Sequence, residues 1–215
     1  MRQLFCIERN FLVLYFHKMQ FPVFPLNGAL LFPNTNLPLN IFENRYIDMV
    51  DYALSNGRLI GMIQTKKNKD FFKIGCLGKI TNFTETSDGR YQINLEGKCR
   101  FKINKILDNK LKFILIDGEE LGYTSNFKKQ TSALGIELLS GFKKYLKIKK
   151  IDFNTSEFES LDALNLAKII CVISPLDYLT KQMLLEFDSS DDLCKNLISV
   201  LEMEINNIGK SSKIN

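Results

Sequence analysis

The spacing of apolar residues changes part-way along the chain, and this change predicts two lobes of different structure. From Phe21 to about Glu120, short apolar runs and alternating segments such as Tyr91–Leu95 are typical of β-strands. After about Asn126 the apolar residues recur at helical spacing instead. We therefore expect an α+β fold in which a β lobe precedes a helical lobe.

Glycine and proline mark the corners of the predicted β lobe. Ser87–Gly89 predicts a hairpin turn, and Glu96–Gly97 predicts another turn. One helix interrupts the strands over residues 42–55, where the apolar spacing is helical and Asn56–Gly57 supplies a stop. Closely spaced strands with such corners favour a small barrel or a curled sheet.

The predicted helices of the second lobe begin and end at recognisable residues. Leu134, Leu138 and Phe142 mark the buried face of the first helix. Ser156 and Glu159 have the spacing of a capping box for the second, which continues over Leu161–Ile173. The later helices are expected at Leu176–Phe187 with Pro175 before it, and from the capping residues Ser189–Asp191 to a stop at Gly209.

These patterns divide the chain into four parts. Residues 1–18 hold an apolar run that is too short for a signal peptide or a membrane span. We interpret them as a disordered leader or as a stretch ahead of a true start at Met19. The other parts are a β lobe over residues 19–125, a helical lobe over residues 126–209 and a tail over residues 210–215.

Composition adds little to this picture. Hydrophobic residues make up 45% and charged residues 25%, which is typical of a soluble globular protein, so we expect a cytoplasmic location and no membrane partner. The net charge of +5 does not by itself demand nucleic acid. The five cysteines are dispersed among apolar neighbours, which favours reduced, buried thiols over a zinc site or a disulfide framework. We expect neither a metal nor a cofactor.

The residues of common catalytic sites are missing from the sequence. No phosphate-binding G-x-x-x-x-G-K-[ST] loop and no H-E-x-x-H motif occurs. The one histidine, His17, lies in the predicted leader, which disfavours Ser–His and Cys–His nucleophile pairs. No local signature marks a Ser–Lys dyad, and Asp191 and Asp192 suit the positive end of a helix. We expect a protein that is not an enzyme.

Three segments together resemble the N-terminal domain of the Lon proteases. Phe21–Leu26, Leu31–Pro33 and Leu37–Tyr46 are similar to the family's P-L-F-P-L, L-F-P-G and L-P-L-x-I-F-E-x-R-Y. Departures are Asn27 in place of the usual Arg, Asn34 in place of the usual Gly, and the lack of a Tyr-Arg-rich strand after Phe101. The further matching segments are Ile60–Met62, Gly75–Ile80, Asp88–Arg90, Gly97–Phe101, and Pro175 with Lys181–Glu186.

This resemblance covers most of the chain and implies both a fold and a function. The implied fold is a β-barrel lobe of the pseudouridine-synthase-and-archaeosine-transglycosylase (PUA-like) type with one helix, followed by a C-terminal helical bundle. The implied function is a non-catalytic module that binds unfolded or partly folded protein segments. On this interpretation it is an adaptor or regulator linked to proteolysis, with a protease as a further candidate partner. The oligomeric state stays open.

The candidate peptide-binding residues lie in the segments that carry the resemblance. For residues 42–46 there are two interpretations: Glu43 and Arg45 line a peptide groove, or Phe42 and Tyr46 anchor a helix while the two charges pair with neighbours. A patch of exposed apolar residues such as Phe32 or Phe127 is a further option. The candidates are Phe32, Pro33, Phe42, Glu43, Arg45, Tyr46 and Arg90.

Nucleic acid is the alternative ligand. Some PUA-like folds bind RNA, and Lys143, Lys144 and Lys147 lie on one face of a predicted helix, with Lys128 and Lys129 before it. No aromatic residues alternate with these lysines to stack on bases, so a solvated helix face is the simpler interpretation. The alternative remains an RNA- or DNA-binding PUA-like protein.

Overall fold

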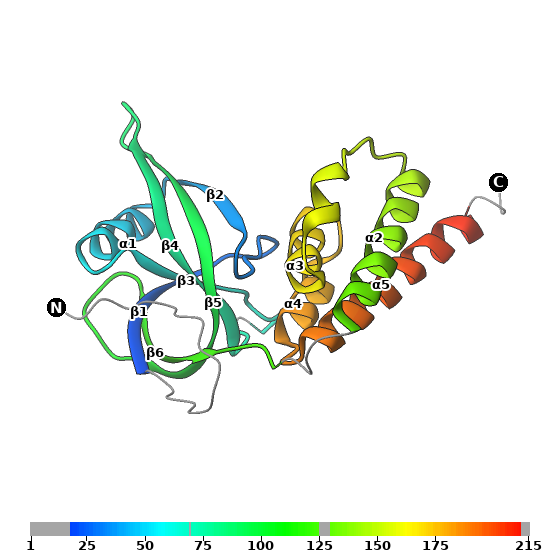
Figure 1. Cartoon of the computed structure of the whole chain (residues 1–215). Coiled ribbons are helices and arrows are strands. Elements are labelled where there is room, and N and C mark those ends of the chain that lie inside the picture. Colours follow the sequence, from blue (N-terminus) through cyan, green and yellow to red (C-terminus); the bar gives the residue numbers. More distant parts are fainter. Residues whose placement is uncertain (1–17, 69, 125–129, 212–215) are drawn as a thin grey trace.

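The computed structural model describes residues 18–68, 70–124 and 130–211, and these form two lobes that lie side by side (Figure 1). The leader interpretation, Phe127, Lys128, Lys129 and the predicted boundary after residue 125 lie outside the described residues. The predicted α+β order is confirmed, because the strands precede the helices apart from one helix within the β lobe.

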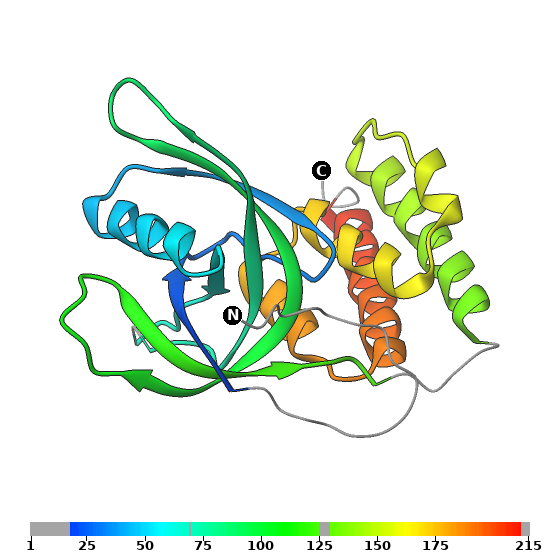
Figure 2. The same ribbon diagram turned by 60° about the vertical axis from the view of Figure 1, so that its left-hand side comes forward.

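Five strands of the β lobe close into a barrel, and a sixth extends it (Figure 2). The closed circuit runs β1–β3–β4–β5–β6, and β6 pairs with both β1 and β5. Only β1 and β3 are parallel among the paired strands described. The strands are β1 Lys18–Pro25, β2 Asn36–Ile41, β3 Leu59–Ile63, β4 Ile74–Glu85, β5 Tyr91–Leu107 and β6 Ile114–Leu121.

The predicted turn at Glu96–Gly97 is wrong, because β5 runs through it without a break. Gly97 is needed for a close approach instead: a Cβ there would lie 2.0 Å from the carbonyl oxygen of Phe32. The segment before β2 crosses β5 at this point, and Asn34 donates its backbone N–H to the Gly97 carbonyl. The hairpin at Ser87–Gly89 is confirmed, with Gly89 at φ 77°.

Helix α1, Asn44–Ser55, covers one opening of the barrel on the side away from the helical lobe (Figures 1 and 2). It begins two residues later than the predicted range and buries Met49, Val50 and Ala53 in the barrel core. A second barrel core forms around Phe21 and Phe101, whose rings meet edge to face.

Helices α2, α3 and α5 lie beside one another in the second lobe, and α4 lies at the junction with the β lobe (Figure 1). Leu134, Leu138 and Phe142 are buried, which confirms the predicted inner face of α2. The helices are α2 Gln130–Lys149, α3 Ala163–Ile173, α4 Tyr178–Glu186 and α5 Ser190–Ser211, with a short 3-10 helix, η1, at Ser156–Ser160.

The helix starts differ from the prediction because aspartates cap them. No side-chain cap forms at η1, so the capping box expected at Ser156 is wrong. Asp162 accepts from the backbone N–H of Asn165 and starts α3, while Asp177 caps α4 two residues after Pro175. Ser189 does cap the last helix as predicted, through the N–H of Asp192.

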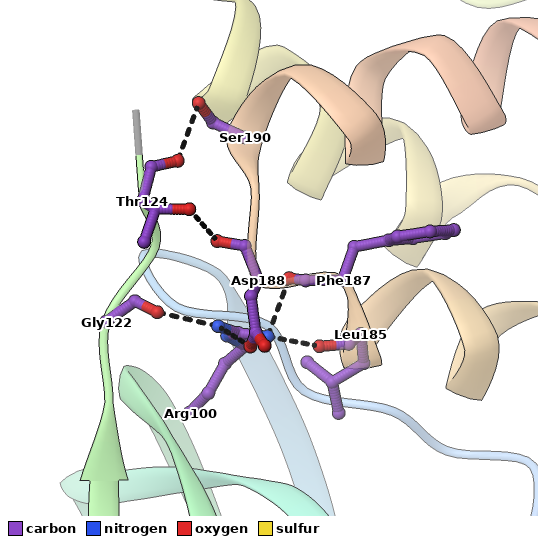
Figure 3. Close-up of polar contacts among 7 residues, drawn as sticks. All are labelled: Arg100, Gly122, Thr124, Leu185, Phe187, Asp188 and Ser190. Carbon is purple, nitrogen blue, oxygen red and sulfur yellow. Dashed lines mark hydrogen bonds and ion pairs between the residues drawn. The ribbon is translucent and has the colours of Figure 1, made fainter. Parts of the chain in front are cut away.

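The lobes are joined by a buried guanidinium (Figure 3). Arg100 of β5 is fully buried and donates to the carbonyl oxygens of Leu185 and Phe187 at the end of α4, at 3.1 and 2.6 Å. It also donates to the carbonyl of Gly122 at 2.6 Å and to the carboxylate of Asp188 at 3.0 Å. One side chain therefore caps a helix of one lobe and holds the last strand of the other.

The ring of Tyr123 lies between two cations at the same junction. The Arg100 guanidinium is 4.2 Å from the ring centroid, and the Lys168 ammonium of α3 is 5.1 Å from it. Burial lowers the pKa of Lys168 and raises the pKa of Tyr123. The junction thus combines hydrogen bonds with cation–π contacts, and little water reaches it.

Variants at Arg100 and at Asp188 should show how much the carbonyl groups and the carboxylate each contribute to stability. Arg100→Met leaves three carbonyl groups at the junction without this donor, and we expect a loss of about 3 kcal/mol or more in the free energy of unfolding. Asp188→Asn should cost about 1 kcal/mol or less, because the Asp188 side chain is 73% exposed. Urea unfolding measures the free energy of unfolding of both variants. Equal losses would contradict the conclusion that the carbonyl groups are the more important partners of Arg100.

Candidate functional site

A groove of about 950 Å³ opens between α2, η1 and α3. A volume of this size is typical of ligand sites in proteins. Its walls are mostly apolar, with a smaller number of polar and charged side chains among them. The lining residues are Gly135, Ile136, Leu139, Ser140, Lys143, Phe158, Glu159, Ser160, Leu161, Asp162, Ala163 and Leu166.

Helix α2 has a second apolar stripe that faces this groove. Ile136 and Leu139 lie three residues apart, on a different side of the helix from Leu134 and Leu138. Ile136 is 73% exposed, the largest exposed fraction among the large apolar side chains described. An apolar side chain in such a position is a natural contact for another apolar surface.

Two of the three charged side chains that line the groove pair with each other. Lys143 of α2 donates to the carboxylate of Glu159 of η1 at 2.9 Å. This hydrogen bond and the lysine charge lower the pKa of Glu159, so the carboxylate stays ionised at neutral pH. The third, Asp162, accepts the backbone N–H of Asn165 and caps α3. The groove therefore offers an apolar surface with one ion pair and one capping carboxylate at its rim.

Small residues set the width of the groove at one end. A Cβ built on Gly135 of α2 would lie 3.6 Å from the Cβ of Ala163, the first residue of α3. The two helices approach closely there, because neither residue has a side chain beyond Cβ. Helix α2 then continues past η1, and Phe158 and Leu161 form the opposite wall.

The described residues contain no cluster typical of a metal site, and their cysteines are buried. No group of three His, Cys, Asp or Glu in the described part of the chain is placed to hold a metal ion. The four described cysteines are buried thiols, and burial raises the pKa of Cys194 to about 11. No described helix is long and apolar enough to cross a bilayer.

Comparisons with known proteins agree on one family. The model of the ATP-dependent protease La (LON) substrate-binding domain matches residues 20–203. The chain belongs to the LON substrate-binding domain family. Lon protease of Buchnera aphidicola (subsp. Acyrthosiphon pisum) is 26% identical over 202 residues, and Lon protease 3 of Sorangium cellulosum is 28% identical over 195 residues.

The matches cover most of this LON domain but only part of the proteases. The match to the Buchnera protease includes 87% of this chain and 25% of the protease, and the match to the Sorangium protease includes 86% and 23%. The chain thus spans about a quarter of the length of these relatives. The fold is similar to a Lon N-terminal domain protein of Xanthomonas campestris, with a TM-score of 0.65 and 19% identity over 84% of this chain and 98% of that one. The fold is also similar to the N-terminal domain of Mycobacterium avium complex Lon protease. The TM-score is 0.71, and the identity is 16% over 86% of this chain and 98% of that one.

Two residues of the LON domain at which the sequence departs from the family pattern have clear structural roles. Asn34 adopts φ 64°, a conformation that Gly takes freely and Asn tolerates better than most residues. The side-chain oxygen of Asn27 accepts from the backbone N–H of Thr65 at 3.0 Å and so holds the loop after β3. Both departures therefore keep the local backbone in place.

Phe32 and Pro33 were expected to contact a peptide, and the structure contradicts this. Phe32 is 0% exposed and belongs to the core of the helical lobe, together with Leu30. Pro33 is also buried. The segment between β1 and β2 thus places two β-lobe side chains inside the other lobe, where a ligand cannot reach them. These residues connect the lobes instead.

The structure places residues 42–46 at the start of α1, far from the groove (Figure 1). Glu43 and Arg45 form an ion pair at 2.9 Å, as the structural interpretation proposed. Tyr46 is buried, and its ring lies 4.3 Å from that of Phe24. Phe42 is 63% exposed, so its expected role as an anchor is wrong. A binding role for Glu43 and Arg45 stays a prediction.

Arg90 and one of the three helix lysines also have partners within the chain. Arg90 pairs with Asp88 at 3.0 Å across the β4–β5 turn, and both side chains are half exposed. Of the three candidate lysines, Lys143 is held by Glu159, while Lys144 and Lys147 are exposed. The turn interpretation of residues 88–90 fits this geometry, and contact of Arg90 with a partner stays a prediction.

The contrast between Tyr46 and Phe42 can be measured. Tyr46→Ala should lower the free energy of unfolding by about 3 kcal/mol, because it removes a buried ring from the contact with Phe24. Phe42→Ala should change it by about 0.5 kcal/mol or less, because that ring is mostly in water. Thermal and urea unfolding test both. A large loss for Phe42→Ala would show that the ring is packed in solution.

Proposed function

We propose that this LON domain binds apolar segments of unfolded or partly folded proteins in the groove between α2, η1 and α3. One observation carries the proposal: the exposed side chain of Ile136 and several partly buried apolar side chains line a groove, and Lys143 and Glu159 at its rim form an ion pair. Apolar burial is non-directional, so such a surface accepts many sequences. The family match supports the same kind of ligand, since it describes a substrate-binding domain.

The proposed role is a binding module without catalytic function of its own. The match covers residues 20–203 with a substrate-binding domain, and the chain spans about a quarter of the proteases it resembles. On this proposal the module acts in the cytoplasm as an adaptor or regulator of proteolysis, with a protease as its second partner. The groove selects the segment, and the partner carries out the cleavage.

Salt dependence distinguishes this function from nucleic acid binding. A labelled, reduced and carboxymethylated polypeptide should bind with an affinity that changes less than about threefold between roughly 50 and 200 mM salt, because apolar burial drives the contact. The same polypeptide in its native, disulfide-bonded form should not bind. The affinity for a nucleic acid ligand would instead fall by about a thousandfold or more over that range of salt concentration.

The lysines provide the matched variant for this experiment. Changing Lys144 and Lys147 together to Gln should leave polypeptide binding within about threefold, because both side chains are exposed and neither lines the groove. Mixed RNA oligomers should bind weakly to both proteins. Tight RNA binding with a steep salt slope that disappears in the double variant would overturn the proposed function.

A further inference from the structure

The backbone of the groove walls restricts the conformation of a guest. The lining residues fall in two stretches, 135–143 and 158–166, and contain no strand. The walls formed by α2 and α3 consist of helices whose interior backbone groups are bonded within the helix itself. They offer no row of N–H and C=O groups to an extended chain, as an open sheet edge would.

An extended guest would therefore find no partners on these helical walls for those of its backbone groups that it buries. Each buried N–H or C=O group without a partner costs about 1–3 kcal/mol. Five or six such residues would cancel the gain from burying their apolar side chains, about 1.5–3 kcal/mol each. A helix avoids this cost because its backbone groups pair with each other.

The spacing of the wall residues fits a helical guest. Ile136, Leu139 and Lys143 follow one another at i, i+3 and i+7 along α2. Ridges of side chains at these spacings pack into the grooves of another helix. The span from Gly135 to Lys143 corresponds to about 12 Å, a little over two turns.

From this geometry we infer that the groove takes amphipathic segments in the α-helical conformation. The inference rests on the proposed function and names the class of segment that the groove selects. The guest inserts residues at i, i+3, i+4 and i+7 against Ile136, Leu139 and Phe158. Its polar face remains in water, because the rim charges of Lys143 and Glu159 are already paired. The guest completes a helical layer over α2 and α3.

Two peptides of identical composition test the conformation. Each has about 18 residues, long enough for a helix to form, with leucines at helical period in one and at alternating positions in the other. The helical-period peptide should bind at least about tenfold more tightly, a difference of about 1.4 kcal/mol. Its far-UV circular dichroism should show added helix on binding, and a central Pro should abolish that binding.

Variants locate the site. Ile136→Glu should weaken the helical-period peptide at least about tenfold without loss of fold, because the side chain is 73% exposed. Met203→Glu is the matched control: Met203 is 64% exposed on α5 and does not line the groove, so binding should be unchanged. Equal losses of peptide affinity in both variants would show that the peptide does not bind in this groove.

The outcomes for the inference and for the proposed function differ. If the alternating peptide binds as tightly as the helical one and Ile136→Glu weakens both, the helical inference is wrong and the proposed function stands. The helical inference is also wrong if an unfolded polypeptide binds in the groove but neither peptide does. If neither the unfolded polypeptide nor the peptides bind, the proposed function itself fails.

Discussion

The arrangement of the two lobes depends on the Arg100 guanidinium. It lies where β5, the end of β6 and the end of α4 meet, and it donates to a carbonyl group or carboxylate from each side of the junction. Removing a guanidinium from water is costly, and only a nearly complete set of acceptors offsets that cost. The position of α4, and with it the helical layer that carries the groove, is therefore tied to a specific residue of the barrel.

The sequence predicted those features of the fold that depend on neighbouring residues. The hairpin, helix α1 and the inner face of α2 follow from local spacing and turn chemistry, which act over a few residues. Gly97 was assigned to a turn because glycine is common there. Its real constraint is the Phe32 carbonyl, which is far away along the chain, and no local pattern contains that contact.

The candidate site was harder to predict for the same reason. Phe32 was expected at the surface because its segment resembles a family motif, but a motif does not say whether its residues face a ligand or a core. The groove exists because α2 and α3 approach at Gly135 and Ala163 and then separate around η1. One signal was available: Ile136 and Leu139 are apolar residues outside the stripe of Leu134, Leu138 and Phe142. A helix with two apolar faces has a second surface to cover.

The insertion of Leu30 and Phe32 into the core of the helical lobe also affects how the chain acquires its structure. These side chains are synthesised about a hundred residues before the helices that enclose them, so their contacts are of high sequence separation. Until α2 to α5 have emerged, the nascent barrel has no cover for these two residues, and the bundle in turn lacks two of its core side chains when the barrel is absent. We therefore expect the lobes, although distinct in architecture, to share one cooperative folding transition, and a cut between them to leave two incomplete fragments.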